Sequence, residues 1–165
     1  ALGLEGETKS ALAMAAQWHD KGKDRPVWQR YARNPSPDTP LAKSTNYLDG
    51  GALGGYRHEF GSLLEATADP ETQQHPEADL ILHLIATHHG WARPHFRRNA
   101  WDNSRTTAEN EEAAAEVMRR FARLQQRFGR WGLAWLESLL RCADIAASRP
   151  DALPAATASD VEVNT

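Results

Sequence analysis

The chain has 165 residues, of which 41% are hydrophobic and 25% are charged, and its formal net charge is −3 at pH 7. These values predict one globular domain, and they exclude a membrane-spanning protein and a protein that coats nucleic acid by bulk charge. The single cysteine, Cys142, excludes a cysteine-rich zinc domain. Since the sequence also lacks a signal-peptide pattern, we expect a cytoplasmic protein.

The hydrophobic pattern predicts an all-α domain without strands, built from five helices over residues 5–20, 57–66, 78–89, 111–128 and 131–148. The third of these helices is apolar almost all round, so we expect it at the centre of the fold. A short aromatic turn is expected over 27–31. Prolines, glycines and polar residues indicate a long loop over 34–55, a polar aromatic loop over 91–109, and a disordered tail or linker over 149–165.

Histidines and carboxylates gather at the predicted helix ends. His19 is followed by Asp20 where the first helix ends, and His88 and His89 end the buried third helix. A lone histidine on an apolar face is usually a satisfied core residue, but these pairs indicate the wall of a metal site. Nitrogen and oxygen donors together suit Mn, Fe, Co, Ni or Zn, with Mg also possible. Asp20 is the candidate bridging ligand, because a carboxylate can bind two ions at once and a neutral imidazole ordinarily cannot. Two ions about 3.5–4 Å apart can hydrolyse a phosphodiester.

Four motifs, in chain order, carry a resemblance to a known family. They are Trp18-His19-Asp20-Lys21-Gly22-Lys23, Arg57-His58-Glu59 with Ser62, Thr87-His88-His89-Gly90, and Arg141-Cys142-Ala143-Asp144 with Ser148. In content and order they resemble the HD (histidine-aspartate) superfamily of metal-dependent phosphohydrolases, most of all the nuclease domain of the CRISPR-associated type I helicase-nuclease. Residues 124–148 resemble the subtype in which the nuclease domain is C-terminal to the helicase.

The resemblance implies an irregular HD-superfamily helical domain over 1–148. It also implies truncation at the N-terminus, because the family has a further metal-binding histidine upstream and no histidine precedes His19. The implied metal ligands, for two ions, are His19, Asp20, His58, His88, His89 and Asp144. Asp20 and Lys23 would be catalytic, with Lys23 facing the substrate phosphate. The implied activity is metal-dependent cleavage of single-stranded DNA in CRISPR interference against invading DNA. The implied partners are a helicase module, in the same or another chain, and the CRISPR surveillance complex.

The residues by themselves leave other interpretations open. An ion pair with Arg141 would also explain Asp144, and a solvent-exposed polar cluster would explain His58. His83 is expected to be a core histidine or one that contacts a metal ligand. Two more histidines are expected at the surface, His75 and His95. At the level of function, the alternatives are an HD phosphohydrolase that acts on a small nucleotide and a non-catalytic docking module.

Arginines form two candidate DNA-binding surfaces. In the fourth predicted helix and just after it they recur every three or four residues without an intervening acidic residue, as Arg119, Arg123, Arg127 and Arg130. This stripe predicts a track for backbone phosphates, with a solvated helix face as the alternative. After the His88-His89 pair, Arg93 and Arg97 alternate with aromatic residues. The aromatic residues of this stretch are predicted to form platforms for unstacked bases, with packing at the domain edge as the alternative. They are Trp91, Phe96 and Trp101.

Overall fold

The computed structural model describes residues 6–36, 38–43 and 48–149, and all regular structure within them is helical, which confirms the all-α prediction. The α-helices are α1 (Gly6–Trp18), α2 (Pro26–Tyr31), α3 (His58–Ala68), α4 (Pro70–Gln74), α5 (Ala78–Thr87) and α6 (Thr107–Ala147). Three short 3-10 helices join them, η1 (Lys21–Asp24), η2 (Gly50–Leu53) and η3 (Arg98–Ala100). No helix among the described residues is long and apolar enough to cross a bilayer.

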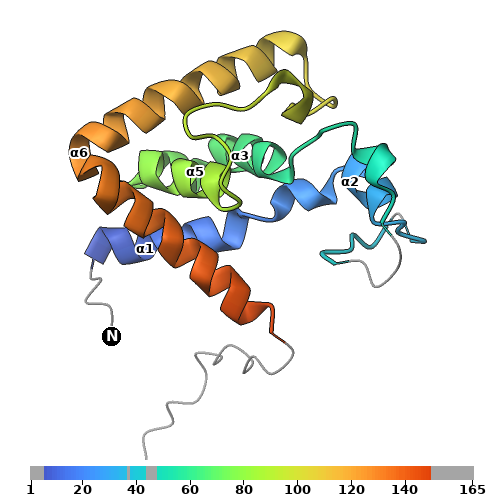
Figure 1. The fold of residues 1–165 in the computed structure, drawn as a ribbon, viewed down its shortest axis with the longest axis horizontal. Helices are drawn as coiled ribbons and strands as arrows, with labels where there is room; N and C mark the ends of the chain where they lie inside the picture. The colour runs from blue at the N-terminus through green and yellow to red at the C-terminus, as the bar shows by residue number, and fades with distance from the viewer. Residues whose placement is uncertain (1–5, 37, 44–47, 150–165) are drawn as a thin grey trace, which may run out of the picture.

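Helix α5 is the centre of the core, as its sequence predicts. Leu80, Ile81, Leu84 and Ile85 are fully buried, and α5 contacts α1, α3 and α6. Figure 1 shows α3 and α5 side by side in the middle of the molecule, with α1 below them and α6 running around one side. This arrangement buries apolar side chains from four helices in one core and leaves the ends of α1, α3 and α5 to build a site.

Helix α6 joins the two C-terminal helices that the sequence predicts as separate elements. It begins at Thr107 because Thr106 and Glu109 form a capping box, in which the Thr106 Oγ1 accepts from the Glu109 amide and the Glu109 carboxylate accepts from the Thr106 amide. Gly129 interrupts the helix with a φ of 68° and a ψ of 170°, values that glycine adopts without steric cost. The resulting bend turns the second half of α6 across α1 (Figure 1).

The remaining predictions differ little from the structure. The turn expected over 27–31 is α2, while the loops over 34–55 and 91–109 contain η2 and η3. Helix α4 was not predicted, because its sequence lacks apolar periodicity; Asp69 caps it by accepting from the Thr72 amide at 2.7 Å. The tail predicted over 149–165 lies outside the described residues except for Arg149.

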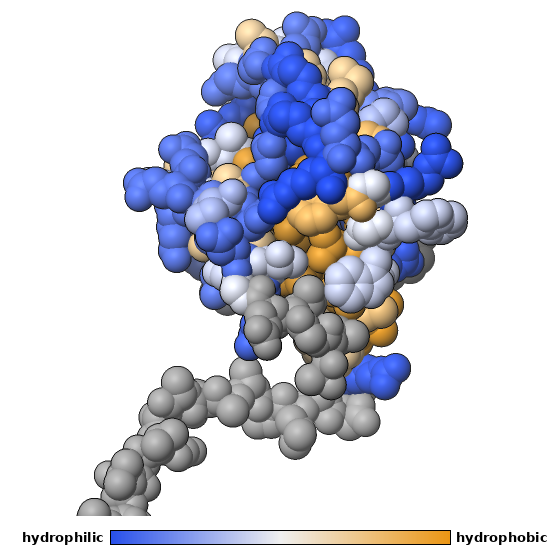
Figure 2. Space-filling model, turned by 90° about the vertical axis from the view of Figure 1, so that its left-hand side faces the viewer, coloured by the Kyte–Doolittle hydropathy of each residue, from blue (hydrophilic) through white to orange (hydrophobic). Residues whose placement is uncertain are grey.

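One side of the molecule exposes apolar surface. Figure 2, which faces the bend of α6, shows a hydrophobic strip framed by hydrophilic residues. Large hydrophobic side chains are also exposed on α6, with Trp131 at 85%, Ile145 at 50% and Trp135 at 45%. A contiguous apolar strip on a surface is typical of a contact face.

Candidate metal centre

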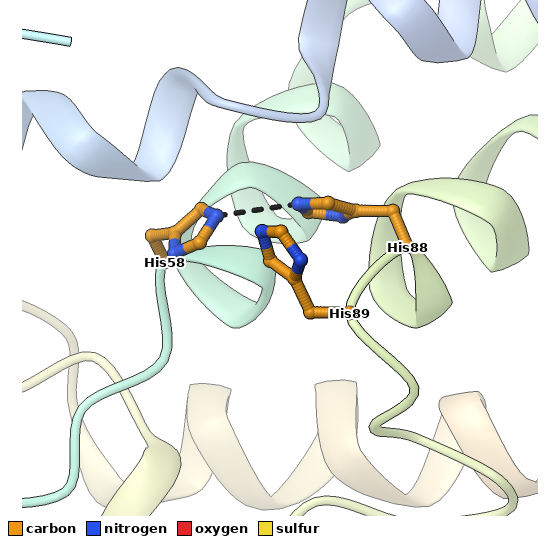
Figure 3. A group of neighbouring side chains, drawn as sticks. All are labelled: His58, His88 and His89. Carbon is orange, nitrogen blue, oxygen red and sulfur yellow. Dashed lines mark hydrogen bonds between the residues drawn. The ribbon is translucent and has the colours of Figure 1, made fainter. Parts of the chain in front are cut away.

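Three histidines meet where α3 begins and α5 ends. His58 is the first residue of α3, and His88 and His89 directly follow α5. Their imidazoles point toward one another (Figure 3), with 3.2 Å between the Nε2 atoms of His58 and His88. One nitrogen from each of the three rings lies within 4.8 Å of the others. Such a group of imidazole nitrogens could hold a divalent ion.

The other predicted ligands adjoin these histidines. Asp20, after the end of α1, has its Oδ1 3.3 Å from His58 Nε2. His19 Nε2 lies 3.5 Å from Asp144 Oδ1 in the last turns of α6 and 3.6 Å from Asp20 Oδ2. The His19 and His88 rings are 5.1 Å apart, centroid to centroid. The fold therefore brings together all six residues that the sequence singles out as ligands, from four separate segments.

The turn after His19 is fixed against α3 by the residues that surround the ligands in the motifs. The Gly22 amide donates to Ser62 Oγ at 2.8 Å, and Ser62 Oγ in turn donates to the His19 carbonyl at 2.7 Å. The Tyr56 hydroxyl donates to the Gly22 carbonyl at 2.8 Å. A Cβ on Gly22 would lie 2.0 Å from the His58 carbonyl oxygen, so only glycine allows this approach. The Gly and Ser of the motifs thus place His19 and Asp20 relative to His58.

Hydrogen bonds behind two imidazoles set which nitrogen faces the cluster. His19 Nδ1 donates to the Ala16 carbonyl and His88 Nδ1 donates to the Ile85 carbonyl, both at 2.7 Å. In the neutral form of each ring, Nε2 is then the nitrogen with the free lone pair, which is the atom that can bind a metal.

Glu59 lies behind the third imidazole. Its Oε2 is 3.4 Å from His58 Nδ1, its side chain is buried, and neither of its carboxylate oxygens has a hydrogen-bond partner. A carboxylate in this place can orient a metal-binding imidazole and raise its basicity. The sequence did not single out Glu59 for such a role, and only its position within the Arg57-His58-Glu59 motif could have indicated it.

The electrostatics of the cluster favour the metal-binding forms of His88 and Asp20. Burial, together with the neighbouring imidazoles of His58 and His89, lowers the pKa of His88 to about 2. Burial disfavours the ionised form of Asp20, but the close approach of the His58 imidazole and the hydrogen bond from Lys23 outweigh it and hold the pKa of Asp20 well below its usual value. At neutral pH the cluster therefore contains a neutral imidazole at His88 and an ionised carboxylate at Asp20.

Two buried polar atoms of the cluster lack a hydrogen-bond partner, namely His19 Nε2 and Asp20 Oδ1. Buried polar atoms nearly always have a hydrogen-bond partner. Unpaired nitrogen and oxygen atoms that face a group of imidazoles therefore fit a site for cations. Lys23 Nζ lies 2.7 Å from Asp20 Oδ2 and places a positive charge at the edge of the same cluster.

Comparison with known families agrees with this geometry. The family model described as "Cas3, HD domain" matches residues 2–153. The chain belongs to the HD-domain family of Cas3. The resemblance read from the four motifs is therefore confirmed, and this family of CRISPR-associated, metal-dependent nucleases works in the context of a helicase module. No curated protein and no solved structure matches the chain.

The arginine stripe of α6 lies away from this cluster, and its arginines pair with carboxylates. Some of these carboxylates are in α6 itself and others are at the start of α5. Arg119 pairs with Glu112 and Glu116, Arg123 with Asp79 and Glu116, and Arg127 with Glu77. Glu77 and Asp79 come from the start of α5, more than forty positions earlier in the chain. Only the packing of α5 on α6 reveals these partners.

The aromatic loop after α5 supplies fewer exposed rings than the sequence suggests. Phe96 is only 5% exposed and packs edge-on against Phe60, so it is a core residue and the prediction of a base platform there was wrong. The Arg57 guanidinium lies 4.0 Å from the Trp91 ring centroid, and the Arg98 guanidinium lies 5.3 Å from that of Trp101.

The other polar residues of this region are placed as follows. Arg93 pairs with Glu137 at 3.2 Å, and Glu137 also accepts from the buried His83 at 2.8 Å, so His83 is a core histidine as expected. Arg97 is exposed, as is His95, whereas His75 is half-buried with its Nε2 3.1 Å from Ser10 Oγ.

Proposed function

We propose that this chain is a nuclease domain that hydrolyses phosphodiester bonds of single-stranded DNA in CRISPR interference against invading DNA. One observation carries the proposal: six imidazole and carboxylate side chains from four segments converge, and two of their buried nitrogen and oxygen atoms have no hydrogen-bond partner. A family of metal-dependent nucleases and a donor set of this kind point to the same chemistry.

The proposed ligands of two divalent ions are His19, Asp20, His58, His88, His89 and Asp144, with Asp20 as the bridging carboxylate. Mixed nitrogen and oxygen donors favour Mn, Fe, Co, Ni or Zn, and Mg is compatible with the carboxylates. When bound, such ions supply Lewis-acid stabilisation of a phosphoryl group and promote the ionisation of water.

The protein's own residues prepare the site for that chemistry. The neutral His88 offers a lone pair without first losing a proton at neutral pH. Lys23, 2.7 Å from Asp20, is close enough to place its ammonium against a phosphate oxygen or the departing oxygen, and so to offset the negative charge that develops there. Lys23 is therefore a proposed catalytic residue together with Asp20.

Arginines are the proposed contacts to the DNA backbone. Arg93 borders a hollow of about 140 Å³ that His88 also lines, so a strand at the metal centre would pass this guanidinium. Arg97 follows in the same loop. A second, more distant contact would be the stripe of Arg119, Arg123 and Arg127, where phosphates would compete with the carboxylates that these arginines now contact.

The proposed partners are a helicase module, in the same or another chain, that delivers the single strand, and the CRISPR surveillance complex. The hydrophobic strip in Figure 2 and the exposed Trp131 support a contact with another protein surface. The proposed location is the cytoplasm, where such a complex would meet invading DNA.

A second candidate function is hydrolysis of a small nucleotide. It is favoured by a pocket of about 430 Å³ that reaches His58, since pockets of roughly 300–1,000 Å³ are typical of small-ligand sites. A non-catalytic docking module would not need the imidazole and carboxylate groups that converge at the cluster.

The test is cleavage of circular and linear single-stranded DNA across several divalent ions, with a chelator control and with nucleoside phosphates and cyclic nucleotides in parallel. We expect chelator-sensitive cutting of both DNA forms, and its loss in Asp20→Ala with the far-ultraviolet circular dichroism unchanged. Asp24→Ala, an exposed carboxylate in the same turn, is the matched control. Full activity in a folded Asp20→Ala protein would contradict the proposed site, and hydrolysis of the small nucleotides alone would favour the second function.

A further inference from the structure

A pocket beside the metal centre is not used by the ligands. It lies between α2, η2 and the start of α3, at the end of the molecule where Figure 1 places α2. Its volume is about 430 Å³. The residues that argue for its role are Trp28, Tyr31, Leu53, Tyr56, Arg57 and His58.

The walls of this pocket are fixed by packing and hydrogen bonds. Trp28 and Tyr56 are buried in a small hydrophobic cluster against which Tyr31 and Leu53 pack. The Trp28 and Tyr31 rings meet edge to face, with centroids 6.1 Å apart. Tyr56 donates its hydroxyl to the carbonyl of Gly22, in the turn that holds Asp20. The pocket and the metal ligands are therefore positioned by the same contacts.

The chemistry of the walls suits a nucleotide. The aromatic and aliphatic side chains offer an apolar surface to a base, while Arg57 and Lys43, which also line the pocket, offer positive charge to a phosphate. The guanidinium of Arg57 is held 4.0 Å from the ring centroid of Trp91. One wall of the pocket is His58, whose Nε2 belongs to the metal cluster. A group in the pocket therefore adjoins whatever phosphodiester the cluster holds.

We propose that this pocket binds the base of a nucleotide next to the phosphodiester at the metal centre. The inference rests on the proposed nuclease function and names a subsite for its substrate. The pocket selects for the presence of a base rather than for its identity, because the Tyr56 hydroxyl is already engaged with Gly22 and is not available to read a base edge. Tyr31, the half-buried ring, is the residue that would contact the base most directly.

The experiment maps cutting along a single strand that carries one abasic site at a fixed position. The strand has a uniform base sequence and an end label, and the cut frequency at each phosphodiester is compared with that of the same strand without the abasic site. Stacking on an aromatic ring predicts that the bonds which would place the gap in the pocket are cut between about 5-fold and 150-fold less often. Comparing bonds within one strand cancels differences in folding and metal content.

Variants then assign the effect to the pocket. In Tyr31→Ala, and in Tyr31→Leu, which retains apolar volume without an aromatic face, the depletion of cuts near the abasic site should shrink. Trp135→Ala removes an aromatic ring that is 45% exposed on α6, outside the pocket, and should leave the depletion unchanged. Replacing the abasic site with each of the four bases in turn should give the same wild-type cutting pattern.

The outcomes separate the subsite from the nuclease function. If the wild-type protein shows chelator-sensitive cutting whose frequency at every bond equals that of the strand without the abasic site, the subsite is overturned and the nuclease function still stands. The same holds for a depletion that persists unchanged in both Tyr31 variants. If no chelator-sensitive cutting of any strand occurs, the nuclease function itself is overturned and the subsite with it.

Discussion

Replacing Glu59 with Gln should separate the stability of the fold from the metal affinity of the cluster. Glu59 is 0% exposed, and neither carboxylate oxygen has a hydrogen-bond partner. Burial of a carboxyl group without a hydrogen-bond partner is costly, and Gln has the same shape but cannot carry a charge, so Glu59→Gln should raise the free energy of unfolding of the metal-free protein by about 1–3 kcal/mol. A residue that only supports the fold would show the opposite sign.

The same substitution should weaken metal binding through His58. Its Nδ1 lies 3.4 Å from Glu59 Oε2, and removal of such a partner behind a ligand typically costs about 10–100-fold in metal affinity. That change corresponds to roughly 1.4–2.7 kcal/mol of binding free energy. Calorimetric titration with Mn²⁺ or Zn²⁺ measures the affinity, and urea unfolding in the presence of a chelator measures the stability.

The exposed Glu71, which lies in α4, offers a control with the same change of charge. Glu71→Gln should alter neither quantity by more than about 0.5 kcal/mol. Lower stability of Glu59→Gln with an unchanged metal affinity would refute the reasoning, because the carboxylate would then serve the fold and not the imidazole.

Three further predictions concern the turn, the start of α5 and the stripe. Gly22→Ala should destabilise the fold by about 1–3 kcal/mol in urea unfolding and weaken metal binding, because its Cβ would clash with the His58 carbonyl, whereas Gly51→Ala, with its nearest neighbour 3.5 Å away, should be mild. The pKa of Asp79 is lowered by its hydrogen bond from an α6 arginine, so the stability from this pair is present above the ordinary value of 3.8 and is lost as pH falls through the folded value. Asp79→Asn should flatten that acid loss in urea titrations, and an unchanged pH profile would argue against it. In the triple alanine variant of Arg119, Arg123 and Arg127, the salt dependence of single-strand binding should fall by about 0.7 for each phosphate that the stripe no longer neutralises. An unchanged slope would mean that these arginines serve only their carboxylate partners.

Local sequence determines much of the fold and of the candidate site. Helix α5 is apolar almost all round, and this pattern predicts its central position. Thr106 and Glu109 cap α6, and Gly129 permits its bend, each through backbone preferences that act within a few residues. Four of the six proposed ligands are also recognisable in the sequence, because the pairs His19-Asp20 and His88-His89 stand at helix ends and imidazole and carboxylate side chains suit the same ions.

The tertiary structure alone decided which side chains are paired or covered. The arginines of α6 form a positive stripe in sequence, but Glu77 and Asp79 meet them because α5 packs alongside. Phe96 follows the paired histidines in a polar loop, yet it is buried against Phe60. Such contacts join segments far apart in the chain, and no local pattern encodes them.

The same holds for the parts of the site that only folding assembles. Asp144 reaches His19 because α6 bends and crosses α1, and Glu59 becomes a buried carboxyl group without a hydrogen-bond partner because the core closes around it. The pocket beside His58 exists only where α2 and η2 pack against the start of α3. The sequence by itself determined which chemical groups are available and which helices carry them. The packing of those helices determined which groups face one another, because distance and burial depend on long-range contacts.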